Sequence, residues 1–168
     1  LLLVLISGKT ALGASSLASI EYEKAQKSYY GLLKSKKKMQ RRDQWAKVIQ
    51  EFDSIYSKYK SSSEAYKAAF TMGDLYEQLH AISRREKDLD EALKYYQKTV
   101  NEFKPSRLTD DALYRQGEIY FNRDQYTSSL DFFETILKLT PSGDITAKAK
   151  IRIADIRPLV YGRYTKKK

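Results

Sequence analysis

The sequence predicts an all-α protein, a right-handed superhelical stack of about three helix pairs plus a C-terminal capping helix. Only 7 Gly and 3 Pro occur among 168 residues, and no run of alternating Val, Ile and Thr is bounded by turn residues, so a sheet is disfavoured. The phrase RDQYTSSLDFFETILKLTP at residues 123–141 repeats RDQWAKVIQEFDSIYSKYK at residues 42–60. Both phrases place an aromatic residue early and a Phe at the same later position, which is typical of repeated helices that bury the same face.

We expect seven helices, at residues 18–37, 42–60, 63–82, 88–104, 107–122, 124–140 and 144–157. The first two make the first pair, and EYEKAQKSYYGLLKS forms the long first helix. In the second helix, Trp45, Val48, Phe52 and Ile55 follow an i, i+3, i+7, i+10 spacing, which lines one helical face.

The third and fourth helices form the second pair. KAAFTMGDLYEQ places Ala69, Gly73 and Tyr76 on one face, and DLDEALKYYQKTVNEFKP places Ala92 and Tyr96 on the face of its partner. We expect Gly73 to lie against Ala92, because two small residues allow a close approach of their helices. HAISRREK adds about two helical turns between the two helices.

The third pair carries the clearest pattern. DALYRQGEIYFN places Leu113, Gly117 and Tyr120 on one face, and the next helix offers Ser129 and Phe133. We expect Gly117 to lie against Ser129, with the aromatic residues filling the gap between neighbouring pairs.

The two ends of the chain are expected to lie outside a repeat domain that we place at residues 19–157. LLLVLISGKTALGASSLAS is an apolar run followed by small residues, which is typical of a signal peptide that lacks its basic start; we assign residues 1–18 to it. Asp144 is a candidate N-cap for the last helix, and Pro158 is expected to end it. Residues 158–168 would then be a linker or tail. A signal peptide predicts a periplasmic or otherwise exported protein.

The net charge of the chain is strongly positive, and its basic residues are unevenly distributed. Lys and Arg outnumber Asp and Glu by 31 to 21, for a net charge of +10. KSKKKMQRR gathers six basic residues, which are Lys34, Lys36, Lys37, Lys38, Arg41 and Arg42. Two interpretations stay open, a solvated corner between the first two helices or a surface for an anionic polymer of the cell envelope. Nucleic acid is disfavoured, because the signal peptide would separate the domain from it and no recognition fold is visible.

The sequence predicts no catalytic, metal or cofactor site. Cys is absent, and the single His80, which we place in the inserted loop, cannot build a usual zinc site alone. Neither a Gly-x-Ser-x-Gly elbow nor a Gly-rich phosphate loop occurs.

At Leu113, Gly117, Tyr120, Phe133 and Pro141 the spacing resembles the tetratricopeptide repeat, with Ser129 where that family prefers Ala. This resemblance implies a protein-interaction module whose first helices line a groove for a protein or peptide partner. The groove positions it implies are Lys67, Phe70, Asp74 and Glu77 in the second pair, and Tyr114, Glu118, Phe121 and Asn122 in the third. The alternative is that Tyr114 and Phe121 are core residues that pack against the next pair.

Three segments are similar to the N-terminal repeat region of exported bacterial N-acetylmuramoyl-L-alanine amidases. They are the long first helix, the Trp45 phrase RDQWAKVIQEFDSIYSKYK, and AISRREKDLDEA. That resemblance implies the targeting or regulatory region of a peptidoglycan amidase, with catalysis supplied elsewhere. ALYRQGEIYFNRDQYTSSLDFFETILKLTP is also similar to periplasmic repeat scaffolds of envelope constriction, and lipoproteins of outer-membrane assembly are a third relative. An anionic-polymer or nucleic-acid binding repeat protein is the remaining alternative.

Overall fold

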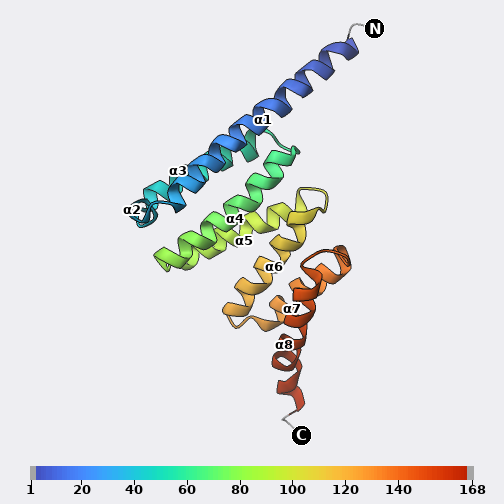
Figure 1. The fold of residues 1–168 in the computed structure, drawn as a ribbon. Helices are drawn as coiled ribbons and strands as arrows, with labels where there is room; N and C mark the ends of the chain where they lie inside the picture. The colour runs from blue at the N-terminus through green and yellow to red at the C-terminus, as the bar shows by residue number, and fades with distance from the viewer. Residues whose placement is uncertain (1–2, 166–168) are drawn as a thin grey trace. The chain divides into compact units, whose positions relative to one another are not determined.

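The computed structural model describes the backbone of residues 3–165 and the side chains of residues 17–162. Eight helices occur in this part of the chain, and none of its residues forms a strand, which confirms the all-α fold (Figure 1). The helices are α1 (Leu3–Leu33), α2 (Lys36–Met39), α3 (Arg42–Lys58), α4 (Ser63–Ser83), α5 (Glu86–Asn101), α6 (Arg107–Asn122), α7 (Tyr126–Leu139) and α8 (Thr146–Thr165). The chain divides into two compact units, unit 1 (Leu1–Ala92) and unit 2 (Leu93–Lys168), with the boundary inside α5.

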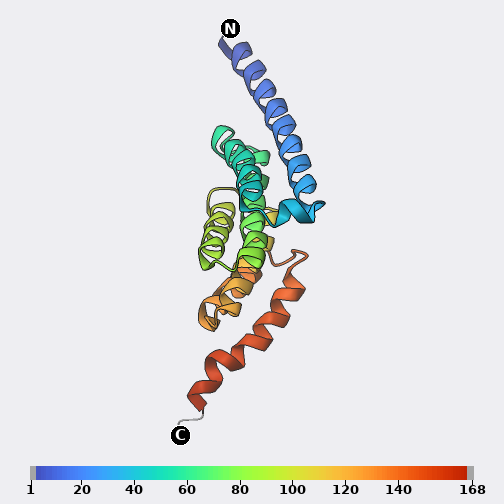
Figure 2. The ribbon, with the colours of Figure 1, turned by 90° about the vertical axis from the view of Figure 1, so that its left-hand side faces the viewer.

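In unit 1, α3 packs against α4, and α1 packs against both. Where the side chains of α1 are described, its buried residues are Ala18, Ala25 and Leu32, seven residues apart, so one stripe of this part of the helix faces the core. Between them, the rings of Tyr22 and Tyr29 meet Phe52 of α3 edge-on, at centroid distances of 5.7 and 6.4 Å. Figure 2 shows α1 continuing well beyond α3 and α4 toward its N-terminus.

In unit 2, α7 packs against α6 on one side and against α8 on the other. The buried core comes from all three helices, and it consists of Leu113, Leu130, Phe133, Ile136, Ile145, Ala149, Ile153 and Ile156. The apolar stripe predicted for α7 supplies two of the fully buried side chains, Phe133 and Ile136. Burial of such side chains is the main favourable term that holds the helices together.

Short polar connections define the helix ends. Ser62 caps α4 by accepting a hydrogen bond from the N–H of Ala65 at 3.0 Å. Three residues adopt a left-handed backbone at helix connections, which are Ser61, Arg84 and Asp124, with φ of 68°, 57° and 57°. Each reverses the chain between two consecutive helices, a position where glycine is the usual residue.

Four sequence expectations at helix ends are wrong, one at α1, one at α4 and two at α8. Residues 18–37 are not one helix, because α1 ends at Leu33 and Ser35 caps the separate helix α2 by accepting from the N–H of Lys38 at 3.3 Å. HAISRREK, residues 80–87, is divided between two helices: its first four residues end α4 and its last two begin α5, so His80 lies in the last turn of a helix and not in a loop. Only residues 84 and 85 separate α4 from α5.

Pro158 does not end the last helix, because α8 continues to Thr165. A proline removes the hydrogen bond to the carbonyl group four residues earlier. Here that residue is Ala154, which is exposed, so water can satisfy its carbonyl oxygen. Asp144 also lies two residues before the start of α8 and is not its N-cap. Of the predicted ends, residues 1–2 and 166–168 lie outside the described residues.

Candidate binding surfaces

The groove residues predicted in unit 1 lie on α4, and α1 packs over part of that surface. They are Lys67, Phe70, Asp74 and Glu77; Lys67 is exposed and the other three are half-buried. The ammonium group of Lys67 lies 5.7 Å from the ring centroid of Tyr22 on α1. A cation at this distance from an aromatic ring is weakly attracted to it. Part of the predicted groove surface therefore holds α1 in place.

Asp74 belongs to a hydrogen-bonded group that joins α1 to α4. The Tyr29 hydroxyl donates to Asp74 Oδ2 at 2.6 Å, and the Gln78 amide donates to the same oxygen at 2.7 Å. Burial raises the pKa of Tyr29, with the Asp74 carboxylate adding to the effect, so this hydroxyl stays a donor at neutral pH. Asp74 thus positions α1.

In unit 2, the predicted aromatic groove residues pack within the unit. The ring of Tyr114 meets Phe133 of α7 edge-on at 5.3 Å, and the ring of Phe121 lies 5.5 Å from that of Tyr126. Both rings are half-buried beside the core of unit 2. Both rings therefore contact α7, the partner of α6 in the same pair, whereas the packing alternative placed them against the next pair.

Arg152 of α8 contacts two of the predicted groove residues of unit 2. Its guanidinium donates from Nε to Glu118 Oε1 at 2.6 Å and lies 4.2 Å from the ring centroid of Phe121. The last predicted residue, Asn122, is exposed at the end of α6. Binding of a peptide at these positions remains a prediction.

The predicted basic patch contains two kinds of residue. Its four lysines, Lys34, Lys36, Lys37 and Lys38, are exposed on and beside α2. Arg41 instead forms an exposed ion pair with Asp43 at 2.9 Å. Four free lysines are therefore the part of the patch that can attract an anion.

Arg42, the sixth residue of that patch, has a structural role. It donates to both carboxylate oxygens of Asp88, at 2.5 and 2.7 Å, and Ser83 donates to the same carboxylate at 2.5 Å. Asp88 is only 1% exposed. These hydrogen bonds, above all those from Arg42, hold the pKa of Asp88 below its usual range. The pair joins the start of α3 to the start of α5.

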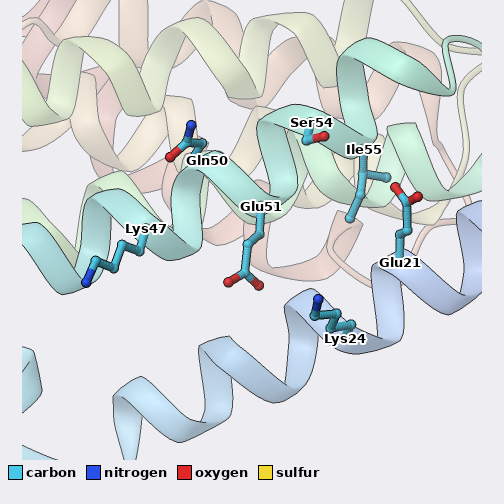
Figure 3. A pocket seen from close by; sticks show the side chains of 7 residues that line it. All are labelled: Glu21, Lys24, Lys47, Gln50, Glu51, Ser54 and Ile55. Atoms are coloured by element: carbon cyan, nitrogen blue, oxygen red, sulfur yellow. The ribbon is translucent and has the colours of Figure 1, made fainter.

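The structure adds a site that the sequence analysis missed, a cleft of about 580 Å³ between α1 and α3. It is lined by Glu21, Lys24, Lys47, Gln50, Glu51, Ser54 and Ile55 (Figure 3). Its volume falls in the range of typical ligand sites. In Figure 3, Glu51 points from α3 toward α1, and Lys24 points from α1 toward α3.

The charges of this α1–α3 cleft are incompletely matched. Glu21 pairs with Lys58 at 2.6 Å, and the hydrogen bond from Lys58 lowers the pKa of Glu21. Lys24 and Lys47 form no ion pair with any described residue. The Oε2 atom of Glu51 is buried and has no hydrogen-bond partner. A buried acceptor of this kind is costly unless something donates to it.

The cleft escaped notice because the repeat pattern does not describe α1. Which residues line the cleft depends on which face of α1 is turned toward α3. In the sequence, only the spacing of Ala18, Ala25 and Leu32 indicates that face. Applying a seven-residue period to EYEKAQKSYYGLL would have placed Lys24 beside the buried stripe.

No group of three or more metal-ligating side chains gathers in the described part of the chain. None of its helices is both long and apolar enough to span a bilayer.

The sequence was compared with protein-family models and with curated proteins. Residues 67–106 and 111–142 match the model of the tetratricopeptide repeat family. The search of curated proteins found no match. The matched ranges cover α4 with α5 and α6 with α7, the second and third predicted pairs. Together with the all-helical fold, this match supports a tetratricopeptide repeat domain, a type of domain that suggests protein interaction and is typically non-catalytic.

Proposed function

We propose that this chain is a non-catalytic protein-interaction module whose α1–α3 cleft binds an acidic peptide segment of a partner protein. The observation that supports it is the placement of two lysines and one unpartnered carboxylate oxygen around a single cleft. Repeat proteins of this type present extended surfaces to partners.

The chemistry of the cleft favours a peptide with carboxylate side chains. Lys24 and Lys47 carry free ammonium groups, which attract carboxylates. Glu51 needs a donor, and a peptide N–H supplies one after a small rotation of the Glu51 side chain.

A capped octapeptide in which glutamate alternates with alanine tests this proposal, with a glutamine-for-glutamate peptide as its control. We expect the acidic peptide to bind the full chain in a calorimetric titration and the glutamine peptide to fail. Lys24→Gln and Lys47→Gln should each weaken binding at least fivefold. Lys27→Gln, which removes the same charge from an exposed position of α1 outside the cleft, should not. Equal affinity for both peptides, or equal effects of all three substitutions, would contradict the proposal.

We further propose that the module belongs to an exported cell-envelope protein, as the targeting or regulatory region of a peptidoglycan amidase. The apolar run at residues 1–18 and the resemblance of the Trp45 phrase to the repeat region of such enzymes support this proposal. We expect the purified chain to release no peptidoglycan fragments, with or without added zinc.

Fusion of residues 1–168 to alkaline phosphatase, which is active only after export, tests the location in a bacterial host. We expect enzyme activity with the full chain and none when residues 1–18 are removed. Activity that is equal with and without these residues would contradict the assignment of a signal peptide.

A further inference from the structure

The last helix of the chain repeats the first helix of the pair before it. Residues 112–119 of α6 read ALYRQGEI, and residues 149–156 of α8 read AKIRIADI. The two segments share Ala first, Arg fourth, a small residue sixth, an acidic residue seventh and Ile last. α8 therefore corresponds in sequence to the first helix of a further pair.

Burial agrees with this correspondence on one side of the two helices. Ala112 and Ala149 are both fully buried. Ile119 and Ile156 are 3% and 0% exposed. For α8 this side packs against α7.

The opposite side differs between the two helices. On α6, Gly117 is covered by α7, because Ser129 Oγ donates to its carbonyl oxygen at 2.8 Å and the Phe133 ring lies within 3.0 Å of the place that a Cβ would take. The equivalent residue of α8, Ala154, is exposed. Around it lies an exposed stripe, which we call the α8 face and which consists of Ala147, Lys150, Ile151, Ala154, Arg157, Pro158 and Tyr161. Ile151 and Tyr161 are 63% and 59% exposed, values that are high for large apolar side chains.

We propose that the α8 face docks one amphipathic helix of a partner protein. Unit 2 itself shows what covers such a face, namely a helix with a small residue and an aromatic residue four positions later, as in Ser129 and Phe133. Ala154 leaves room for the backbone of that helix, and Ile151 and Tyr161 flank the contact.

Charge complementarity specifies an acidic helix. Lys150 and Arg157 both lie on the α8 face and are exposed. Arg157 pairs with Glu134 of α7 at 3.0 Å, whereas Lys150 forms no ion pair with any described residue. A second copy of α8 would bring the same positive charges against them, which is unfavourable. An acidic partner helix instead pairs with the free Lys150 while its small and aromatic residues cover Ala154.

The probe for this proposal is an acetylated peptide of residues 124–140, which contains all of α7 and is called the α7 peptide. It is net negative, and it carries the small and aromatic residues that already cover an equivalent helix. Its control is the same peptide with Phe133→Ala. We expect fluorescence anisotropy to show binding of the α7 peptide to the full chain, and at least tenfold weaker binding of the control.

Three variants of the full chain locate the binding. Ala154→Arg should weaken binding at least tenfold, and circular dichroism should show an unchanged helix content, because the residue is exposed. Lys150→Glu, on the α8 face, should weaken it several-fold. Lys148→Glu makes the same charge change on another side of α8 and should leave it unaltered.

No binding, or equal binding by the wild type and Ala154→Arg, would overturn the proposal. A dimer that sedimentation detects in the wild type and that Ala154→Arg dissociates would assign the face to a second copy, and would overturn it too. The α1–α3 cleft lies in unit 1 and its variants leave α8 unaltered, so this test and that of the proposed function can fail separately.

Discussion

Ser129 donates a hydrogen bond to the carbonyl oxygen of Gly117 at 2.8 Å, which joins α7 to α6 where α6 carries no side chain. A methyl group on Gly117 would lie 2.7 to 3.0 Å from three ring atoms of Phe133, closer than carbon atoms approach without strain. The absence of a side chain at residue 117 therefore sets how closely the two helices pack.

Gly117→Ala should lower the free energy of unfolding relative to Gly31→Ala. Both substitutions gain the helix propensity of Ala, about 1 kcal/mol, but Gly31 has no atom within 4 Å of an added Cβ. Overpacking at residue 117 costs about 1–3 kcal/mol, so the two variants should differ by roughly that amount in urea unfolding. Equal midpoints for the two variants would show that Phe133 moves aside without cost.

The repeat pattern was sufficient to predict this contact but not the contacts between distant segments. Gly117 and Ser129 recur at positions that the two helices of a pair must bring together. Tyr29 and Asp74 are 45 residues apart, and their hydrogen bond depends on which face of α1 is turned toward α4. The repeat pattern does not include α1, so it could not predict this face.

The tripeptide RDQ, which occurs twice, adopts a different local structure in each copy. At residues 42–44 it forms the first turn of α3, and Arg42 reaches Asp88. At residues 123–125 it forms the connection between α6 and α7, with Asp124 in a left-handed conformation. Only the apolar stripe that follows is used in the same way in both copies, so the pattern predicted the helices better than their ends.

Arg42→Gln should destabilise the protein at neutral pH by about 1.5–3 kcal/mol, because it leaves the buried carboxylate of Asp88 without its charged donor. The pKa of Asp88 is lowered in the folded state, so its stabilising effect is present above the unfolded value, near 4, and is lost as pH falls through the folded value. The deficit of the variant should therefore shrink in acid. Urea unfolding at pH 7 and pH 3 measures both effects. Arg41→Gln, at a fully exposed pair, is the control and should lower stability much less than Arg42→Gln does.

Arg84→Gly should stabilise the protein by up to about 1 kcal/mol. Arg84 has a φ of 57° at the end of α4, where a side chain costs about 1–2 kcal/mol, more than the entropy that glycine loses on folding. Arg85→Gly is the matched control, because Arg85 is not among the residues with positive φ. It should lower stability by about 0.5–1 kcal/mol. A loss of stability in both variants would mean that the Arg84 side chain stabilises the helix end by more than its backbone costs.

Glu51→Leu should raise the free energy of unfolding by about 1 kcal/mol while reducing binding of the acidic peptide. The substitution removes a buried oxygen that has no hydrogen-bond partner, which is unfavourable in the free protein. Gln50→Leu changes the neighbouring exposed residue of the same cleft and should alter stability by less than about 0.5 kcal/mol. Thermal unfolding with and without the peptide measures both quantities. A Glu51→Leu variant that is less stable than the wild type would show that the carboxylate already has a favourable environment.

Replacement of Lys34, Lys36, Lys37 and Lys38 by Gln should reduce binding of the chain to isolated cell walls. These four exposed lysines are the free charges of the basic patch, whereas Arg41 and Arg42 are held in ion pairs and are left unchanged. Attraction between exposed charges weakens with salt, because the Debye length falls from about 10 Å at 0.1 M to about 3 Å at 1 M. Sedimentation with cell walls across this range should therefore show wild-type binding at low salt that approaches the level of the variant at high salt.

A control variant has four exposed lysines changed to Gln elsewhere (Lys27, Lys60, Lys104 and Lys150) and carries the same net charge. It distinguishes binding by the local patch from attraction that depends only on the net charge of the chain. Equal loss of binding in the two variants would leave the patch as a solvated corner between α1 and α3.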